Sequence, residues 1–241
     1  MKILVVPDIH GRINWQQPVA DFLNSALPED RVVFLGDYND SFTVPNRQMV
    51  DNFTDVLLLK QREPERVILL LGNHCFPYLF YPTFRCSGFR PELAPALHIL
   101  FKEHHTLFQV ACQFGHYLFT HAGVSEMWLQ ANRTAIKQLL GVNSADTSNL
   151  PHLLNQLLQS GRGCQLLWQV SPDNGGADPV DGPLWVRPRL LDRGLLPGLV
   201  QVVGHTAQRN ILHSINESTN TGFVVIDCHD YNPNEFLILE L

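Results

Sequence analysis

The sequence predicts an α/β protein, and three observations support that prediction. Short runs rich in valine, isoleucine and leucine recur at residues 3–6, 31–35, 67–71 and 200–203. Segments with the apolar spacing of a helix follow the first two runs, at 15–23 and 45–61. Each run ends in a polar turn. Continuous apolar runs that alternate with helices are typical of buried parallel strands.

The chain changes character after Cys75. Residues 76–88 are aromatic and contain proline, which predicts a lid or cap loop, and with a helix at 93–105 they form an expected cap insertion over 76–105. Residues 107–114 and 116–120, separated at Gly115, predict an antiparallel hairpin. Further elements are expected as helices at 129–140 and 150–159, a loop at 171–182, and strands near 211–214, 222–226 and 235–239. No repeat or linker divides the chain, so a single domain over 1–241 is predicted.

Composition excludes several classes of protein. The chain has 241 residues, 45% of them hydrophobic and 17% charged, which is typical of a globular protein and not of a disordered or fibrous one. The formal net charge of −6 argues against a large nucleic-acid-binding surface. The first apolar run is too short for a signal peptide, and no stretch reaches the length of a membrane span. Five cysteines without a CxxC motif predict reduced thiols and a cytoplasmic location.

Five apolar runs end in a small residue or a turn, and side chains that can bind metals follow directly. In chain order these are Asp8 and His10, Asp37 and Asp40, Asn73 and His74, His121, and His205. Strand ends on one side of an open α/β sheet form the crevice in which ligands bind. Residues far apart in the sequence are therefore expected to converge on one site.

The donor types predict the kind of metal centre. Carboxylate, imidazole and amide oxygen suit Mn, Fe, Zn, Ni or Mg ions. Six ligands are expected, from Asp8, His10, Asp37, Asn73, His121 and His205. That number exceeds what one catalytic ion with open positions needs, and it suits two ions about 3.5–4 Å apart that share a carboxylate. Asp37 is the natural bridge, because each of its oxygens can face one ion, and Gly36 before it allows a close backbone approach. Such a centre binds phosphate oxyanions and acidifies water.

The ordered set of motifs resembles the calcineurin-like metallophosphoesterase superfamily, and within it the phosphoprotein phosphatase branch with its bacterial and phage relatives. The motifs are Asp8-Ile-His10-Gly, Gly36-Asp37-Tyr-Asn-Asp40, Gly72-Asn73-His74, His121-Ala-Gly and Gly204-His205-Thr. Each motif alone is weak, whereas the ordered set is specific. The resemblance implies a four-layer α-β-β-α sandwich in which two mixed sheets are flanked by helices.

The resemblance also implies a role for each residue. The first metal ion is expected on Asp8, His10 and Asp37, and the second on Asp37, Asn73, His121 and His205. His74 matches the proton donor to the leaving group, and Asp40 matches the acid that orients it. The implied reaction is direct attack of a hydroxide that bridges the ions on phosphorus, without a phosphoenzyme. Manganese is the expected metal, with Fe, Zn, Ni or Mg as alternatives.

Two departures from the family pattern affect the substrate side of the site. Ser41 follows Asp40 where these phosphatases have an arginine that clamps the phosphate, and Cys75 follows His74 where they have glutamate. Serine does not replace a bidentate arginine. Arg12, Arg187 and Arg189 are the candidates for that role, and Arg187 is favoured.

Three functions remain open on the sequence. The first is a phosphomonoesterase of the protein Ser/Thr/Tyr phosphatase type. The second is a nucleotide hydrolase that cleaves dinucleoside polyphosphates or a phosphodiester, because residues 121–128 resemble a segment of bacterial diadenosine tetraphosphatases. The third is a binding module that has lost catalysis, which the intact ligand set and His74 disfavour. The expected partner is a phosphorylated protein, peptide or nucleotide. Association with a membrane is not expected.

Overall fold

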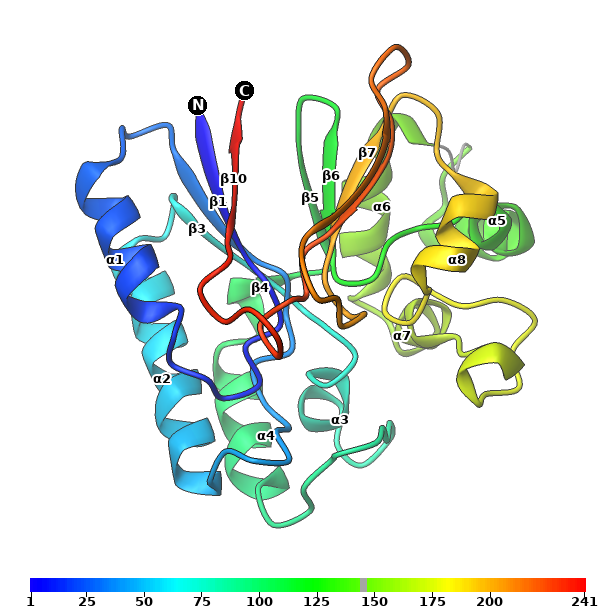
Figure 1. Ribbon diagram of the computed structural model, residues 1–241. Helices are drawn as coiled ribbons and strands as arrows, with labels where there is room; N and C mark the ends of the chain where they lie inside the picture. The colour runs from blue at the N-terminus through cyan, green and yellow to red at the C-terminus, as the bar shows by residue number, and fades with distance from the viewer. Residues whose placement is uncertain (144–146) are drawn as a thin grey trace. The chain divides into compact units, whose positions relative to one another are not determined.

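The computed structural model describes residues 1–143 and 147–241, and the chain forms two compact units (Figure 1). The first unit comprises residues 1–108 and 228–241, and the second comprises residues 109–227. The single domain over 1–241 and the cap over 76–105 stay predictions.

A five-stranded sheet lies at the centre of the first unit. Its strands, in the order β10-β1-β2-β3-β4, are Leu237–Glu240, Lys2–Val6, Arg31–Phe34, Val67–Leu70 and Phe108–Gln109. Strands β1, β2 and β3 run parallel, and β10 pairs antiparallel with β1. Val6 is in register with Phe34, and Phe34 with Leu69. The loops that follow these three strands therefore begin at the same edge of the sheet.

Helices of the first unit lie beside this sheet in Figure 1. They are α1 (Gln16–Ser25), α2 (Asn46–Arg62), α3 (Phe76–Leu79) and α4 (Ala94–Glu103). Phe53 of α2 and Phe101 of α4 pack with ring centroids 4.4 Å apart, and both rings contact Phe108. Tyr38, in the loop after β2, packs against Phe53 and is fully buried. Aromatic packing thus anchors the loop that carries Asp37 and Asp40.

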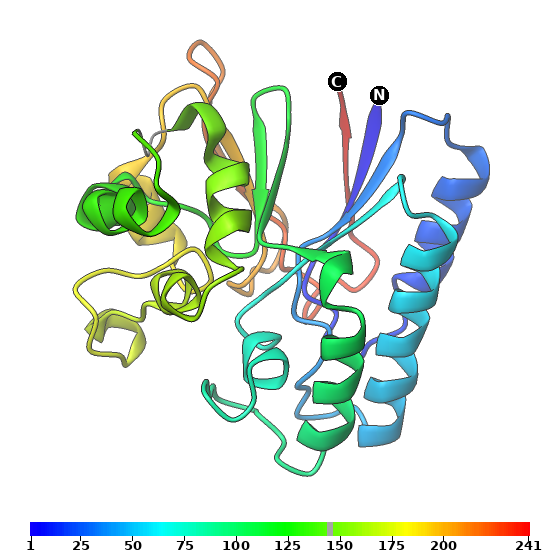
Figure 2. The same ribbon diagram turned by 180° about the vertical axis from the view of Figure 1, so that it is seen from behind.

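The second unit contains another five-stranded sheet. In the order β5-β6-β7-β9-β8 its strands are Ala111–Phe114, Tyr117–Thr120, Val200–Val203, Thr221–Val225 and Leu212–Asn216. Its helices, seen from behind in Figure 2, are α5 (Glu126–Leu140), α6 (Leu150–Leu157), α7 (Gly161–Trp168) and α8 (Pro188–Leu191). The outer pairs β5–β6 and β8–β9 are antiparallel, and the inner pairs β6–β7 and β7–β9 are parallel.

Two mixed sheets flanked by helices confirm the predicted fold class. Three predictions of local structure were incomplete. The expected loop at 76–88 begins with the short helix α3, and the expected strand at 107–114 divides into β4 in the first sheet and β5 in the second. The sequence also did not predict α7. Gly161 and Gly163 lie in α7 and obscure its helical pattern. Ser160 caps α7 by accepting a hydrogen bond from the Gly163 amide at 3.0 Å. A Cβ at Gly163 would lie 2.0 Å from the Leu157 carbonyl oxygen, so this glycine allows α6 and α7 to approach each other.

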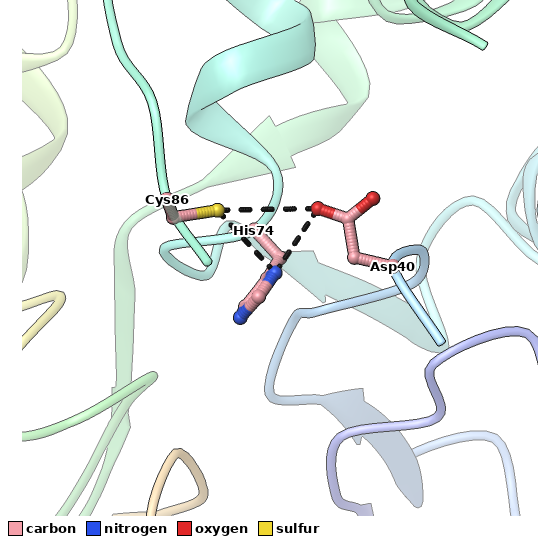
Figure 3. Close-up of side chains that lie close together, drawn as sticks. All are labelled: Asp40, His74 and Cys86. Carbon is pink, nitrogen blue, oxygen red and sulfur yellow. Dashed lines mark hydrogen bonds and ion pairs between the residues drawn. The ribbon is translucent and has the colours of Figure 1, made fainter. Parts of the chain in front are cut away.

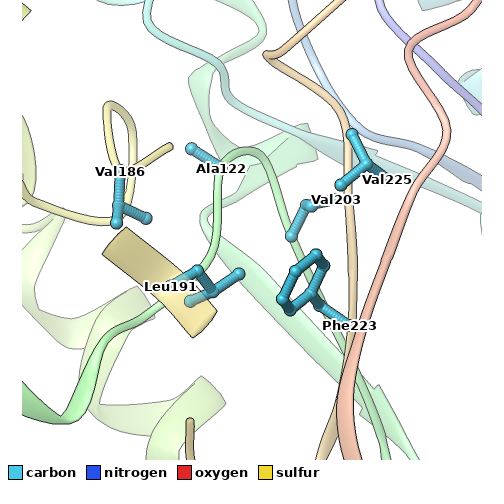
Figure 4. Packing of buried hydrophobic residues seen from close by; sticks show 6 residues of the cluster. All are labelled: Ala122, Val186, Leu191, Val203, Phe223 and Val225. Carbon is cyan, nitrogen blue, oxygen red and sulfur yellow. The ribbon is translucent and has the colours of Figure 1, made fainter. Parts of the chain in front are cut away.

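A small apolar core in the second unit connects strand ends to the segment around α8 (Figure 4). Its members are Ala122, Val186, Leu191, Val203, Phe223 and Val225. Ala122 and Val203 lie at the ends of β6 and β7, next to His121 and close to His205. Val186 and Leu191 flank Arg187 and α8. Burial of these side chains therefore fixes Arg187 relative to the two histidine loops.

None of the helices within 1–143 and 147–241 has both the length and the apolar character that crossing a bilayer requires.

Candidate active site

The loops after β1 and β2 are held together by backbone hydrogen bonds. The His10 amide donates to the Asp37 carbonyl at 2.9 Å, and the Gly11 amide donates to the Tyr38 carbonyl at 2.8 Å. The loops after β2 and β3 also touch, because a Cβ at Gly36 would lie 2.5 Å from the Gly72 nitrogen. Three separate segments of the first unit therefore bring their polar residues together.

Backbone strain is concentrated at the candidate site residues. Positive φ angles are found at His10 (44°), Asp37 (49°), Asp40 (68°) and His205 (65°). Among the described residues other than glycine, only Asn220 shares this conformation. Left-handed backbone is unfavourable for residues with a side chain, and it persists where the surrounding structure imposes it, often at functional sites. Two of these residues lie in tight turns: the Arg12 amide donates to the Ile9 carbonyl across His10, and the Thr206 amide donates to the Gly204 carbonyl across His205, both at 2.7 Å.

Two carboxylates and an oriented imidazole lie together in the first unit. Asp8 and Asp37 are both 1% exposed, and each has a carboxylate oxygen within 4.8 Å of the other. The His10 ring contacts the Asn39 carbonyl through Nδ1 at 2.8 Å. Because that carbonyl accepts the Nδ1 proton, Nε2 is the nitrogen that can bind a metal ion. Asn73 follows β3 and is also buried.

His74 and Asp40 form a close pair, shown in Figure 3. His74 Nδ1 lies 3.0 Å from Asp40 Oδ2, and the Asp40 side chain has no exposed surface. The His74 side chain is 18% exposed. Its backbone amide donates to Asp37 Oδ1 at 2.8 Å, which ties the histidine to the expected bridging carboxylate. The structure thus brings the two predicted residues into direct contact.

Competing effects act on the pKa of His74. Burial by itself would lower that pKa, but the Asp37 carboxylate and the hydrogen bonds with Asp40 and Cys86 outweigh it. The pKa of His74 therefore lies well above its ordinary value. A neighbouring carboxylate stabilises the imidazolium form, which is the form that can donate a proton.

Sequence reasoning missed two residues of this cluster. The Tyr78 hydroxyl donates to Asp40 Oδ1, and the Arg90 amide donates to that hydroxyl at 3.1 Å. Cys86 Sγ lies 3.4 Å from His74 Nδ1 and 3.9 Å from Asp40 Oδ2. Tyr78 lies in the aromatic segment after His74, and only its spacing of four residues from His74 hints at a contact. Nothing in the sequence pointed to Cys86.

The second unit presents the other two predicted ligands. His121 follows β6 and His205 follows β7, and their ring centroids are 5.1 Å apart. The Gly204 amide donates to the His121 carbonyl at 2.8 Å, which joins the two loops. His205 Nε2 contacts the Trp185 carbonyl at 3.2 Å, so Nδ1 is the nitrogen suited to a metal ion.

The three candidate arginines have different surroundings. Arg187 Nη1 donates to the His205 carbonyl at 2.9 Å and to Thr206 Oγ1 at 3.2 Å. Arg187 Nε donates to Asn174 Oδ1 at 3.2 Å. Arg12, in the first unit, pairs with Asp230. Arg189 is exposed and pairs with Asp173 at 3.6 Å. Arg12 also donates from Nη1 to the Asp8 carbonyl at 3.5 Å, so both Arg12 and Arg187 contact a predicted ligand loop, and the Arg187 contact is the shorter one.

Comparison with known proteins identifies the family. The profile of the calcineurin-like phosphoesterase family matches residues 1–209. Among solved structures, a serine/threonine phosphatase from Saccharomyces cerevisiae with similarity to human phosphatase PP5 superimposes with a TM-score of 0.52 at 16% identity. The match covers 94% of this chain and 66% of the yeast chain. A candidate diadenosine tetraphosphatase gives a TM-score of 0.51 at 14% identity, covering 99% of this chain and 92% of the other. No curated protein sequence matches.

The chain belongs to the calcineurin-like phosphoesterase family. It is a metal-dependent phosphoesterase, and hence a hydrolase, of a family that uses divalent metal ions. The donor set fits such ions in each unit taken by itself. The first unit supplies two neighbouring buried carboxylates and an imidazole whose Nδ1 is already engaged. The second supplies two adjacent imidazoles. Oriented imidazoles and paired carboxylates are typical of ligands for Mn, Fe or Zn ions.

Proposed function

We propose that the chain is a phosphatase that hydrolyses phosphomonoesters with two divalent metal ions, in the manner of the protein Ser/Thr/Tyr phosphatases. One observation carries the proposal: a fully buried carboxylate, Asp40, lies 3.0 Å from Nδ1 of His74 in a chain of this family. A phosphoryl transfer that releases an alcohol needs a proton on the leaving oxygen. The Asp40–His74 pair is suited to deliver one.

We assign the two metal ions to the predicted ligands. Asp8, His10 and Asp37 would hold the first ion, and Asp37 with Asn73, His121 and His205 would hold the second. Support comes from the motifs, the family and the chemistry of the donors. When bound, the ions supply positive charge to the phosphate and acidify the water that attacks phosphorus. Manganese is our choice of metal, since oxygen and imidazole donors dominate the set.

His74 acts as the general acid in this proposal. Its Nδ1 faces Asp40, so the proton passed to the leaving oxygen comes from Nε2. Asp40 holds the ring in that orientation and stabilises the imidazolium form before transfer. Tyr78 holds Asp40 in turn. Arg187 binds the phosphate in this proposal, and its contacts with Asn174 and the His205 carbonyl hold its guanidinium beside the His205 loop.

A second candidate function is hydrolysis of dinucleoside polyphosphates or of a phosphodiester. The resemblance of residues 121–128 to a segment of diadenosine tetraphosphatases favours this function. Much of that segment has a structural role here, because Ser125 caps α5 by accepting a hydrogen bond from the Trp128 amide at 3.1 Å. Trp128 is fully buried. The segment therefore starts a helix and discriminates weakly between the two functions.

A substrate panel on metal-reconstituted protein tests the proposal. The panel contains phosphoserine, phosphothreonine and phosphotyrosine peptides, an aryl phosphate, a bis-aryl phosphate and diadenosine tetraphosphate. We expect the highest kcat/KM for a phosphopeptide. Preference for diadenosine tetraphosphate or the diester would favour the second candidate. No turnover of any substrate, with two manganese ions bound per chain, would contradict both. A cytoplasmic location fits the five cysteines, none of which forms a disulfide within the described chain.

A further inference from the structure

Three donor atoms beside the catalytic pair form a triangle within the first unit (Figure 3). His74 Nδ1 and Asp40 Oδ2 are 3.0 Å apart, and His74 Nδ1 and Cys86 Sγ are 3.4 Å apart. The distance from Cys86 Sγ to Asp40 Oδ2 is 3.9 Å. In Figure 3 all three side chains point toward one another. None of these atoms belongs to the six predicted ligands of the catalytic ions.

The triangle has the size of one face of a tetrahedral zinc site. Zinc binds nitrogen and oxygen at about 2.0–2.1 Å and sulfur at about 2.3 Å, so tetrahedral ligands lie about 3.3–3.6 Å from one another. The three observed distances lie within about half an ångström of that range. Small rotations of the cysteine and aspartate side chains would close the difference. A water molecule would complete the tetrahedron.

The charges of this cluster also suit zinc. One imidazole, one carboxylate and one thiolate balance the double positive charge, so the complex is neutral in a partly buried place. A sulfur donor favours zinc over manganese or magnesium. On binding, the Cys86 thiol and His74 Nδ1 each release a proton to solvent, and the metal–sulfur and metal–nitrogen bonds form.

Surrounding contacts hold the three donors in place. Tyr78 donates to Asp40 Oδ1, which orients Oδ2 toward His74 and Cys86. The guanidinium of Arg85, the residue before Cys86, lies 5.0 Å from the Tyr81 ring centroid and 4.3 Å from that of Phe89. Such cation–π contacts restrain the loop that carries the thiol. Outer contacts of this kind are typical of metal sites, where they fix the ligands.

We propose that Asp40, His74 and Cys86 form an inhibitory zinc site, separate from the two catalytic ions. Zinc on His74 Nδ1 displaces the proton that Asp40 accepts and removes Asp40 as the orienting acid. The ring is then held by the zinc ion instead of by Asp40, and it no longer serves as the general acid. The inhibitory effect rests on the function proposed above, whereas the binding of a third metal ion does not.

Cobalt titration tests the binding alone. Cobalt(II) replaces zinc and gives a thiolate-to-metal charge-transfer band in the near ultraviolet, and the six predicted catalytic ligands include no sulfur. We expect the band to grow with one equivalent of cobalt per chain in the wild type. Cys86→Ser should abolish it, and Cys112→Ser, the same change on β5, should retain it. No band in the wild type, or an equal band in Cys86→Ser, would overturn the proposal.

Zinc inhibition of the manganese-loaded enzyme tests the consequence. We expect Cys86→Ser to need at least tenfold more zinc than the wild type for half-inhibition, with Cys112→Ser unchanged. Equal sensitivity of Cys86→Ser and the wild type would show that zinc acts elsewhere, and it would overturn the inhibitory role. A cobalt band in a protein that hydrolyses no phosphate ester would support the zinc site and contradict the proposed phosphatase.

Discussion

A buried carboxylate against a partly exposed imidazole is an asymmetric pair. Asp40 has no exposed side-chain surface, and its carboxylate oxygens contact His74 and Tyr78. His74 keeps 18% of its side chain exposed and can reach a substrate. His74 is therefore suited to exchange protons, and Asp40 is suited to hold the His74 ring in place. Substitutions of the two residues should therefore lower kcat by different amounts.

Replacing His74 by asparagine should lower kcat about 100- to 10,000-fold on a phosphoserine peptide, because the leaving alkoxide loses its proton donor. The loss should be much smaller on an aryl phosphate, whose acidic phenol needs little protonation. Asp40→Asn should lower kcat about 10- to 100-fold. Steady-state kinetics on both substrates measures the difference. His105→Asn, an exposed histidine outside the site, is the control. Equal losses on both substrates would exclude the acid role.

Arg187→Ala should lower kcat/KM for a phosphomonoester about 10- to 150-fold, since charge-assisted contacts to a phosphate contribute about 1.5–3 kcal/mol. Arg189→Ala removes an exposed arginine nearby in the chain and should have no effect. Because Arg187 also contacts the His205 carbonyl, metal content must be measured alongside the kinetics. An unchanged KM and kcat in Arg187→Ala would remove this residue from the site.

Glycine contacts between loops decide how closely the ends of β2 and β3 approach. Gly36 has a φ of 112°, and its Cα faces the backbone of Gly72. Any side chain at Gly36 would separate the Asp37 loop from the Asn73 loop. The distance between these two loops therefore depends on the glycines that follow both β2 and β3.

Gly36→Ala should destabilise the protein by at least about 3 kcal/mol, because a strained φ and a backbone clash combine. Gly115→Ala is the matched control. Its φ is also positive, at 58°, and a Cβ there meets nothing within 4 Å in the described chain. We expect Gly115→Ala to lower the free energy of unfolding by about 1 kcal/mol. Urea unfolding midpoints compare the two variants, and equal losses would contradict the close approach.

On the scale of the whole chain, the first unit is completed by the C-terminal residues. After the second unit the chain returns, and β10 pairs with β1 while the Met1 amino group donates to the Leu241 carbonyl. His229 lies on this returning segment and is 2% exposed. It contacts Asn14 at 3.3 Å and the Glu235 carbonyl at 3.2 Å. Closure of the first unit thus involves a buried neutral histidine.

Burial lowers the pKa of His229 to about 4. The unfolded chain binds a proton at this residue below about pH 6.5, so stability falls as the pH falls from 6.5 toward 4. Between pH 7 and pH 5, protonation of this residue alone should lower the free energy of unfolding by about 2 kcal/mol. Urea unfolding at both values, in the wild type and in His229→Gln, measures the difference. The variant should lose less stability, and an identical loss would contradict the buried neutral state.

Local patterns explain why much of the fold was predictable. Apolar runs of four or five residues and the turns after them depend on neighbours in the sequence, and β1, β2, β3 and β7 were located within a residue. Helix α7 was missed because Gly161 and Gly163 lower its helical propensity, and contact with α6 compensates. The predicted pairing of His74 with Asp40 agrees with the structure, whereas the metal assignment of the six ligands stays a prediction.

Residue type and order along the chain are written in the sequence itself, and they were enough to define the donor chemistry, the family resemblance and the alternation of strand, turn and helix. The positive φ angles at His10, Asp37, Asp40 and His205, the Tyr78 contact and the place of Cys86 became known only from the tertiary structure. These features depend on packing between segments distant in the sequence. A cysteine twelve residues beyond His74 reaches its ring only because the intervening loop folds back.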